Sequence, residues 1–223
     1  MFGVLQFPGS CDDRDALLAC NRVGDARLVW HEDEDLGDLD VVLVPGGFSY
    51  GDYLRAGAIA RFAPAMAAVA RHADAGGAVL GVCNGFQVLC EAGLLPGALL
   101  PNDSLRFVCR QVDVVVENAA TPFTRETEKG ERLSIPVKHE SGRYFLPPEE
   151  LDALEVRGGV VLRYAPGESP NGSARDIAGV VNERGNIMGL MPHPEHAVDP
   201  LCGSEDGLRI FRSLIAWVAS REP

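Results

Sequence analysis

The chain has 223 residues, of which 46% are hydrophobic and 23% are charged, and its formal net charge is −12 at pH 7. This length and composition predict one globular domain over residues 1–223 and exclude a largely disordered chain. The negative charge argues against nucleic acid as a partner, because phosphate binding needs clustered lysine and arginine. No apolar stretch of the sequence is long enough to span a bilayer, so no membrane partner is expected.

The first half of the chain alternates short apolar runs with helical patterns. Ser10 or Asp12 is expected to cap the first helix, and Pro64 opens the second. The alternation predicts an α/β fold with an open, mostly parallel, flavodoxin-like sheet and helices on both faces. The predicted strands are 2–7, 26–30, 41–44 and 79–82, and the predicted helices are 12–23, 64–75 and 86–92.

The second half is richer in strand patterns. The turn sequence at 183–186 predicts a hairpin, and residues 205–219 have the apolar spacing of an amphipathic closing helix. Polar, turn-rich loops are predicted at 121–131 and 166–176. The predicted strands are 107–117, 133–137, 160–164, 177–182 and 187–191.

The cysteines indicate a reducing compartment rather than a disulfide or zinc scaffold. None of them forms a C-x-x-C pair, so a metal site is not expected. The N-terminal segment lacks the basic region of an export signal and is typical of a first strand. We therefore expect a cytoplasmic protein with free thiols, which are Cys11, Cys20, Cys83, Cys90, Cys109 and Cys202.

One of these cysteines, Cys83, stands in the sequence Gly-Val-Cys-Asn-Gly directly after an apolar run. This is the pattern of a nucleophile elbow, in which a sharp strand-to-helix turn lifts the side chain clear of the sheet. The helix that begins near Asn84 would favour the thiolate, which is the reactive form of cysteine. The alternative is a structural thiol at a strand end, and the flanking glycines favour the catalytic interpretation.

The expected base lies far downstream in the sequence Met-Pro-His-Pro-Glu-His, residues 191–196. Its two prolines favour an extended backbone, in which residues i and i+2 point to the same side. Glu195 would then fix the tautomer of His193 and stabilise its protonated form. The alternative is a surface pair in a polar loop. His196 is expected to point away, and His139 to lie in a polar loop, so neither receives a chemical role.

A glycine pair, Gly46 and Gly47, follows the third predicted strand. Ligands bind at the carboxyl ends of strands in open parallel sheets. Amides of Gly46 or Gly47, with the amide of Asn84, can therefore form an oxyanion hole. The alternative is a turn that needs glycine only for its dihedral angles. A phosphate-binding loop is disfavoured, since no Gly-Lys-Ser/Thr follows.

Together these three motifs resemble the class I, or triad-type, glutamine amidotransferases. Longer segments are similar to one family among them, the glutaminase subunits of phosphoribosylformylglycinamidine synthase of purine biosynthesis. The resemblance covers nearly the whole chain and implies a single amidotransferase domain over residues 1–223. The segments that carry it are 46–57, 81–87, 102–107 and 170–173.

The resemblance implies hydrolysis of L-glutamine, with Cys83 as the nucleophile that forms a glutamyl thioester. His193 would act as base and then as acid, and Glu195 would orient it. Asn84 and Gly47 would supply oxyanion donors. The residues expected to contact the bound glutamine are Gln87, Arg106 and Phe107.

The resemblance also implies partners. The ammonia would pass to a large synthetase subunit, accompanied in many bacteria by a small third subunit. That partner converts formylglycinamide ribonucleotide to its amidine with ATP. ATP and Mg²⁺ would bind to the partner, so no cofactor and no metal are expected in this chain. The isolated chain is expected to be a poor glutaminase.

Two positions depart from the family pattern. Ser10 precedes Cys11 where relatives often carry asparagine, and His196 follows Glu195 where they often carry arginine. Neither departure touches the triad, so they bear on partner contacts or loop geometry. Two other interpretations remain, because fold alone does not fix function: another cysteine hydrolase or peptidase-like member of the same superfamily, and a non-catalytic domain that only binds a partner. The segment 102–107 and the intact triad favour the amidotransferase.

Overall fold

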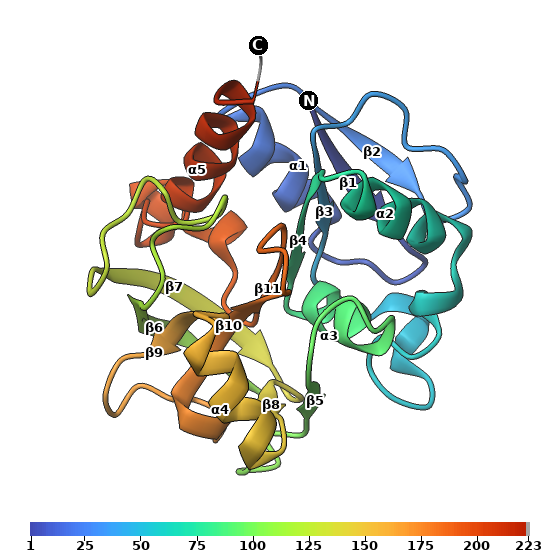
Figure 1. Ribbon diagram of the computed structural model, residues 1–223. Helices are drawn as coiled ribbons and strands as arrows, with labels where there is room; N and C mark the ends of the chain where they lie inside the picture. The colour runs from blue at the N-terminus through green and yellow to red at the C-terminus, as the bar shows by residue number, and fades with distance from the viewer. Residues whose placement is uncertain (222–223) are drawn as a thin grey trace.

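Within residues 1–221, the main sheet of the computed structural model has nine strands. In chain order they are β1 (Phe2–Gln6), β2 (Ala26–Trp30), β3 (Val41–Val44), β4 (Ala78–Val82), β6 (Val108–Val116), β7 (Arg132–His139), β9 (Val160–Tyr164), β10 (Ile177–Val181) and β11 (Ile187–Leu190). Their order across the sheet is β2-β1-β3-β4-β11-β10-β9-β6-β7 (Figure 1). The structure describes residues 1–221, so the end of the predicted domain, 222–223, lies outside the described residues.

The five strands β2-β1-β3-β4-β11 are parallel and have the flavodoxin-like order. Every residue of β3, β4 and β11 is buried. Such strands consist almost wholly of apolar residues and glycine, because helices cover both faces and leave no side for polar residues. The prediction of an open, mostly parallel α/β sheet is confirmed.

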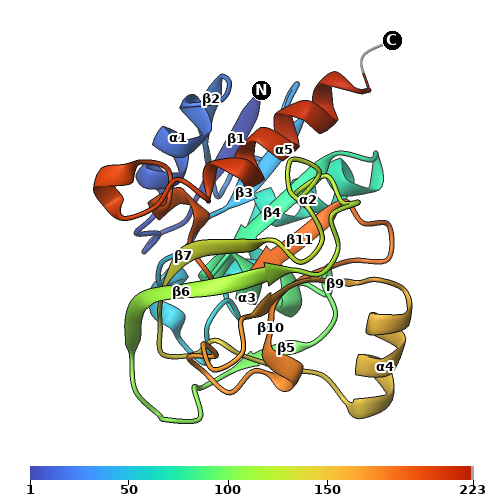
Figure 2. The same ribbon diagram turned by 90° about the vertical axis from the view of Figure 1, so that its left-hand side faces the viewer.

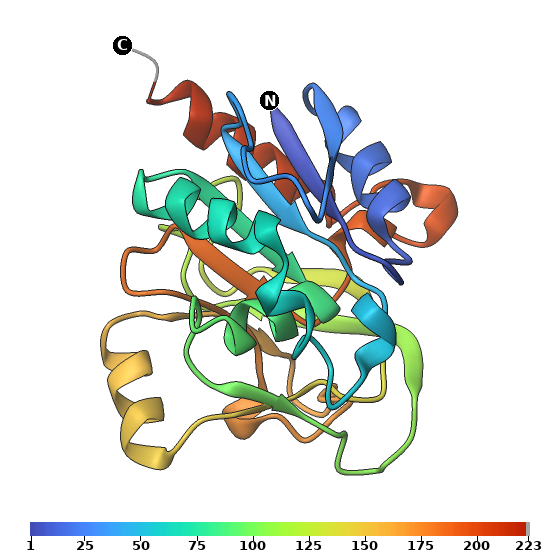
Figure 3. The same ribbon diagram turned by 90° about the vertical axis from the view of Figure 1, so that its right-hand side faces the viewer.

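Helices flank this parallel half on both sides. Seen from one side, α1 and α5 lie in front of the sheet (Figure 2), and from the opposite side α2 and α3 lie in front (Figure 3). No helix within residues 1–221 is both long and apolar enough to cross a membrane. The helices are α1 (Asp13–Asn21), α2 (Pro64–Asp74), α3 (Asn84–Glu91), α4 (Pro148–Val156) and α5 (Leu208–Ala219).

The strands β10, β9, β6 and β7 continue the sheet in antiparallel pairs. β7 is its edge strand, which explains how it accommodates Pro136. The carbonyl of Pro136 accepts a hydrogen bond from the amide of His193 at 2.8 Å. The edge of the antiparallel half is thereby joined to the segment that follows β11.

Two short strands and one α-helix of the described chain were not predicted from the sequence. A small second sheet pairs β5 (Ala98–Leu100) with β8 (Arg143–Phe145), and three residues are too few for a periodic pattern. Helix α4 has proline and two glutamates in its first turn, but it buries only Leu151 and Leu154, so its apolar stripe is weak. The polar loop predicted around His139 is wrong, because β7 runs to His139 and β8 begins at Arg143.

Candidate active site

Cys83 occupies the sharp turn between β4 and α3. Its φ and ψ are 49° and −105°, a conformation that costs a residue with a side chain about 1–3 kcal/mol. Gly85 lets α3 approach β3, because a Cβ there would lie 1.9 Å from the main-chain oxygen of Val44. The predicted nucleophile elbow is therefore present in the fold.

A cavity of about 110 Å³ lies beside Cys83, where the carboxyl ends of the parallel strands meet. Open α/β sheets bind their ligands at this edge. The cavity wall combines segments that are far apart in the sequence, and its residues include Gly47, Cys83, Gln87, Lys138, His139 and His193.

His193 and Glu195 are both buried in the segment after β11. Nδ1 of His193 is 2.6 Å from Oε1 of Glu195, so the carboxylate accepts the Nδ1 proton. The extended backbone expected here is wrong, because Pro194–His196 form a 3-10 turn. Proline at the first position of that turn has a suitable φ, and the histidine and glutamate meet across it.

The charge state of His193 follows from its neighbours. Burial disfavours a charged imidazole, yet the Glu195 carboxylate and the Cys83 sulfur together raise the pKa of His193 to about 10. Nε2 of His193 has no hydrogen-bond partner within residues 1–221. His193 therefore carries a proton at neutral pH, and its Nε2 side is available to the sulfur and to a ligand.

Asp12 completes this cluster and was missed as a site residue. It precedes α1, but its side chain makes no cap hydrogen bond. Its Oδ1 accepts hydrogen bonds from Nζ of Lys138 and, at 3.3 Å, from Nε2 of His196. Burial opposes ionisation, but hydrogen bonding from His196 and the charges of His193 and Lys138 hold the pKa of Asp12 well below its usual range. His196 therefore lies beside the triad, contrary to the expectation that it points away.

The side chain of Asn84 ties the elbow to the glycine loop. Its Oδ1 accepts from the amide of Ser49 and its Nδ2 donates to Oδ1 of Asp52, both at 3.1 Å. The main-chain amides of Gly47 and Asn84 donate a hydrogen bond to no acceptor among the described residues. Both amides are thus free to bind an oxyanion. The main-chain amide of Gly46 likewise donates to no acceptor among the described residues, and the Gly46 carbonyl accepts from the amides of Cys11 and Asp12.

The residues predicted to bind glutamine are only partly brought together. Gln87 lies in the cavity wall, where its Oε1 accepts from Asn84 at 2.9 Å and its Nε2 donates to the carbonyl of Ser141. Phe107 also lines the cavity although it is half exposed. Arg106 is exposed and is not among the lining residues.

A buried amide network holds the far wall of the cavity. Nδ2 of Asn171 donates to the carbonyl of Gly142 at 2.8 Å and lies 3.1 Å from Nε2 of His139. Asn102 accepts from the amide of Gly142 at 3.1 Å and donates to the carbonyl of His139 at 3.0 Å. Both asparagines belong to segments that carry the family resemblance, and their role here is to fix residues 139–142.

His139 itself is buried at the end of β7 and lines the cavity. Burial and the positive charge of His193 lower the pKa of His139 to about 4. A neutral imidazole in this wall accepts or donates hydrogen bonds without adding charge.

A metal ion is not assigned to this cluster. Ligand atoms of Asp12, His193, Glu195 and His196 lie within 4.8 Å of one another, which is close enough to surround a cation. However, Lys138 already places a positive charge on Asp12, and His193 and Glu195 bind each other. The charge that a metal would supply is present in the protein.

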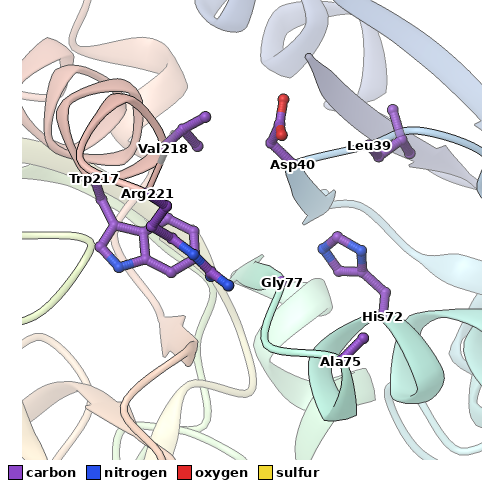
Figure 4. Close-up of a pocket in the computed structure, with 8 residues that line it drawn as sticks. All are labelled: Leu39, Asp40, His72, Ala75, Gly77, Trp217, Val218 and Arg221. Atoms are coloured by element: carbon purple, nitrogen blue, oxygen red, sulfur yellow. The ribbon is translucent and has the colours of Figure 1, made fainter. Parts of the chain in front are cut away.

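A larger hollow lies at the other end of the parallel strands, next to the residues that precede β3 and β4 (Figure 4). Its volume is about 370 Å³, and His72 and Arg221 extend toward each other across it. Nε2 of His72 lies 3.3 Å from the carbonyl of Ala78, and Arg221 stacks over Trp217. None of the described residues that line this hollow is a cysteine or a serine, so size alone does not mark a candidate active site.

Comparison with known proteins agrees with this geometry. Residues 2–218 match the family model of the CobB/CobQ-like glutamine amidotransferase domain. The chain is 60% identical to phosphoribosylformylglycinamidine synthase subunit PurQ of Rubrobacter xylanophilus, over 96% of this chain and 97% of the relative. It is 55% identical to the subunit of the same name from Salinibacter ruber, over 98% and 97%.

The fold comparison gives the same result. A chain of the solved PurLQS structure from Thermotoga maritima superposes with a TM-score of 0.90 at 46% sequence identity, covering 97% of this chain and 98% of that chain. The chain therefore belongs to the CobB/CobQ-like glutamine amidotransferases, in the family of the PurQ subunits of phosphoribosylformylglycinamidine synthase.

Proposed function

We propose that this chain is the glutaminase subunit of a phosphoribosylformylglycinamidine synthase, and that it hydrolyses L-glutamine and delivers the ammonia to a synthetase subunit. The observation that carries the proposal is the strained Cys83 at the elbow with the His193–Glu195 pair beside it, in a chain of this family. Catalytic roles are assigned to Cys83, His193 and Glu195.

The proposed reaction begins with the thiolate of Cys83 next to the imidazolium of His193. The sulfur attacks the carboxamide carbon of glutamine, and the C–N bond breaks as His193 gives its proton to the leaving amide nitrogen. This step releases ammonia and leaves a glutamyl thioester. Water then attacks the thioester, His193 takes the proton from that water, and glutamate leaves as the thiolate forms again.

The tetrahedral intermediates of both steps carry a negative oxygen. The free amides of Gly47 and Asn84 are the proposed donors to this oxygen, and such a donor typically contributes about 3 kcal/mol to the transition state. Gln87 and Phe107, which line the cavity, are the proposed contacts of the glutamine side chain and its α-end. We propose that Arg106 contacts the α-end of glutamine only after a partner subunit has fixed its exposed side chain.

The ammonia is proposed to pass to a large synthetase subunit with a small third subunit, which convert formylglycinamide ribonucleotide to its amidine. ATP and Mg²⁺ are proposed to bind to that partner. We also propose that this chain forms a single domain over residues 1–223. The complex is proposed to work in the cytoplasm, where a reducing medium keeps the six free cysteines reduced.

Covalent labelling tests the nucleophile. A diazoketone analogue of glutamine should alkylate Cys83, and peptide mass spectrometry should locate the adduct there. Cys11 is a matched control, because it is an exposed cysteine that lines the same cavity. Cys11→Ser should label like the wild type, and Cys83→Ser should not label.

The labelling result also separates the alternative functions. An adduct at Cys11, or none even with the synthetase subunit present, would contradict the glutaminase assignment and favour a non-catalytic binding domain. Labelling of Cys83 by simple alkylating agents but never by glutamine analogues would favour another cysteine hydrolase.

A further inference from the structure

We propose that Asp12 is a positioning residue for His193: its carboxylate is a second anion on the Nδ1 side of the imidazole, which stabilises the protonated ring and holds it toward Cys83. The inference rests on the proposed function, because it assigns a further residue to the same reaction. Neither the elbow nor the His-Pro-Glu sequence includes Asp12.

The contacts of Asp12 are divided between its two oxygens. Oδ1 binds Lys138 and His196, as described above, whereas Oδ2 faces Nδ1 of His193 at 3.7 Å. That distance is too long for a hydrogen bond, but the electrostatic attraction between a carboxylate and an imidazolium at this distance is strong when both groups are buried. The side chains of Asp12 and His193 are 3% and 1% exposed, so water does not screen the pair.

Gly46 gives independent support. A Cβ at this position would lie 2.4 Å from Oδ2 of Asp12 and 2.8 Å from Cε1 of His193. The absence of a side chain at residue 46 therefore lets the aspartate and the imidazole approach each other. The amides of Cys11 and Asp12 both bind the Gly46 carbonyl at 3.3 Å, which fixes the aspartate in this place.

Asp12 remains ionised among these groups. Although burial opposes ionisation, the hydrogen bond from His196 and the charges of His193 and Lys138 lower its pKa, so Asp12 is a carboxylate at neutral pH. Lys138, whose side chain is 32% exposed, contacts Oδ1 of Asp12, whereas Oδ2 of Asp12 and Oε1 of Glu195 both face Nδ1 of His193. The titratable groups that face the pair or its immediate partners come from the loop before α1, α1, the elbow, β7 and the turn after β11, and they are Cys11, Asp15, Cys83, Lys138, His139, Glu195 and His196.

The test is an NMR titration of the His193 ring in the free chain, in a Cys83→Ala background that removes the thiol. Asp12→Asn removes the charge and keeps the shape, and Asp12→Glu restores the charge. Asp25→Asn is the control, because Asp25 is exposed and precedes β2 away from the cavity. His193→Gln identifies the signal, and thermal melting checks that each variant is folded.

The expected result is a titration midpoint of His193 that falls by about one pH unit in Asp12→Asn. Asp12→Glu should recover most of the shift, and Asp25→Asn should leave the midpoint unchanged. A structural role alone would lower the melting temperature without moving the midpoint. If Asp12→Asn does not fold, Asp12→Ser is titrated in its place with the same expected shift.

A midpoint in folded Asp12→Asn that stays within about 0.2 pH unit of the parent would overturn the inference. Glutaminase activity of the wild-type chain with its synthetase partner is measured in parallel. Its absence would refute the proposed function, whereas the titration reports on Asp12 alone, so the two failures are distinguishable. In an active complex, Asp12→Asn should also move the alkaline limb of the kcat/KM profile to lower pH.

Discussion

Replacing Cys83 by alanine and by glycine isolates the backbone strain of the elbow. Both variants lose the thiol and should lose glutaminase activity. They differ in the Cβ atom, which the backbone at φ 49° and ψ −105° accommodates poorly. Ala16→Gly in α1 is the matched comparison, since residue 16 is also buried and has ordinary helical geometry.

The magnitude follows from the two backbones. In a helix interior, glycine in place of alanine costs about 1 kcal/mol. At the elbow the same exchange also relieves strain of about 1–3 kcal/mol. Cys83→Gly should therefore be at least as stable as Cys83→Ala. The change in unfolding free energy from alanine to glycine should differ between residues 16 and 83 by about 1–3 kcal/mol.

Thermal melting of the free chain measures this difference. For a chain of this size, each 1 kcal/mol corresponds to a Tm shift of about 2–4 °C. Ala16→Gly should melt below the wild type, whereas Cys83→Gly should melt at or above Cys83→Ala. If glycine destabilises the chain relative to alanine by the same amount at residue 83 as at residue 16, the elbow is not strained.

Three further predictions concern the cavity wall and the elbow. Asn171→Ala removes the amide that binds the Gly142 carbonyl, so unfolding stability should fall by about 1–3 kcal/mol and KM for glutamine should rise; an unchanged KM would show that residues 139–142 do not shape the substrate site. Gly85→Ala should lower the Tm by overpacking against Val44, at a cost of about 1–3 kcal/mol, and a wild-type Tm would contradict the close approach of α3. The pKa of His139 is lower in the folded chain than in the unfolded chain, so stability should be lost as pH falls from about 6.5 to 4, by up to about 3 kcal/mol. Urea unfolding of His139→Gln should show a smaller loss over that range, and an equal loss would refute a buried neutral imidazole.

The parts of the site that were predictable have local sequence signals. Cys83 stands between glycines at the elbow spacing, and His193 and Glu195 are two residues apart. The parallel half of the sheet was predictable for the same reason, since its buried strands are unbroken apolar runs such as β3 and β4.

The parts that were not predictable depend on contacts between distant segments. Asp12 reaches Lys138 across 126 positions and His196 across 184 positions, and no local pattern reports such a contact. The turn at Pro194–His196 was misjudged because the His193 amide binds the edge strand at Pro136, which overrides the extended preference of the two prolines. That turn also brings His196 beside the triad.

Transfer of labelled nitrogen shows whether this chain supplies the ammonia that enters the amidine. The chain is combined with its synthetase partner, formylglycinamide ribonucleotide, ATP, Mg²⁺ and glutamine labelled with ¹⁵N at the amide, and the amidine product is analysed by mass spectrometry. We expect ¹⁵N in the product with the wild-type chain and with Cys11→Ser. With Cys83→Ser we expect no product unless free ammonia is added, and that product should carry no label. Labelled product from the Cys83→Ser complex, or product only from free ammonia in the wild type, would contradict the proposed function.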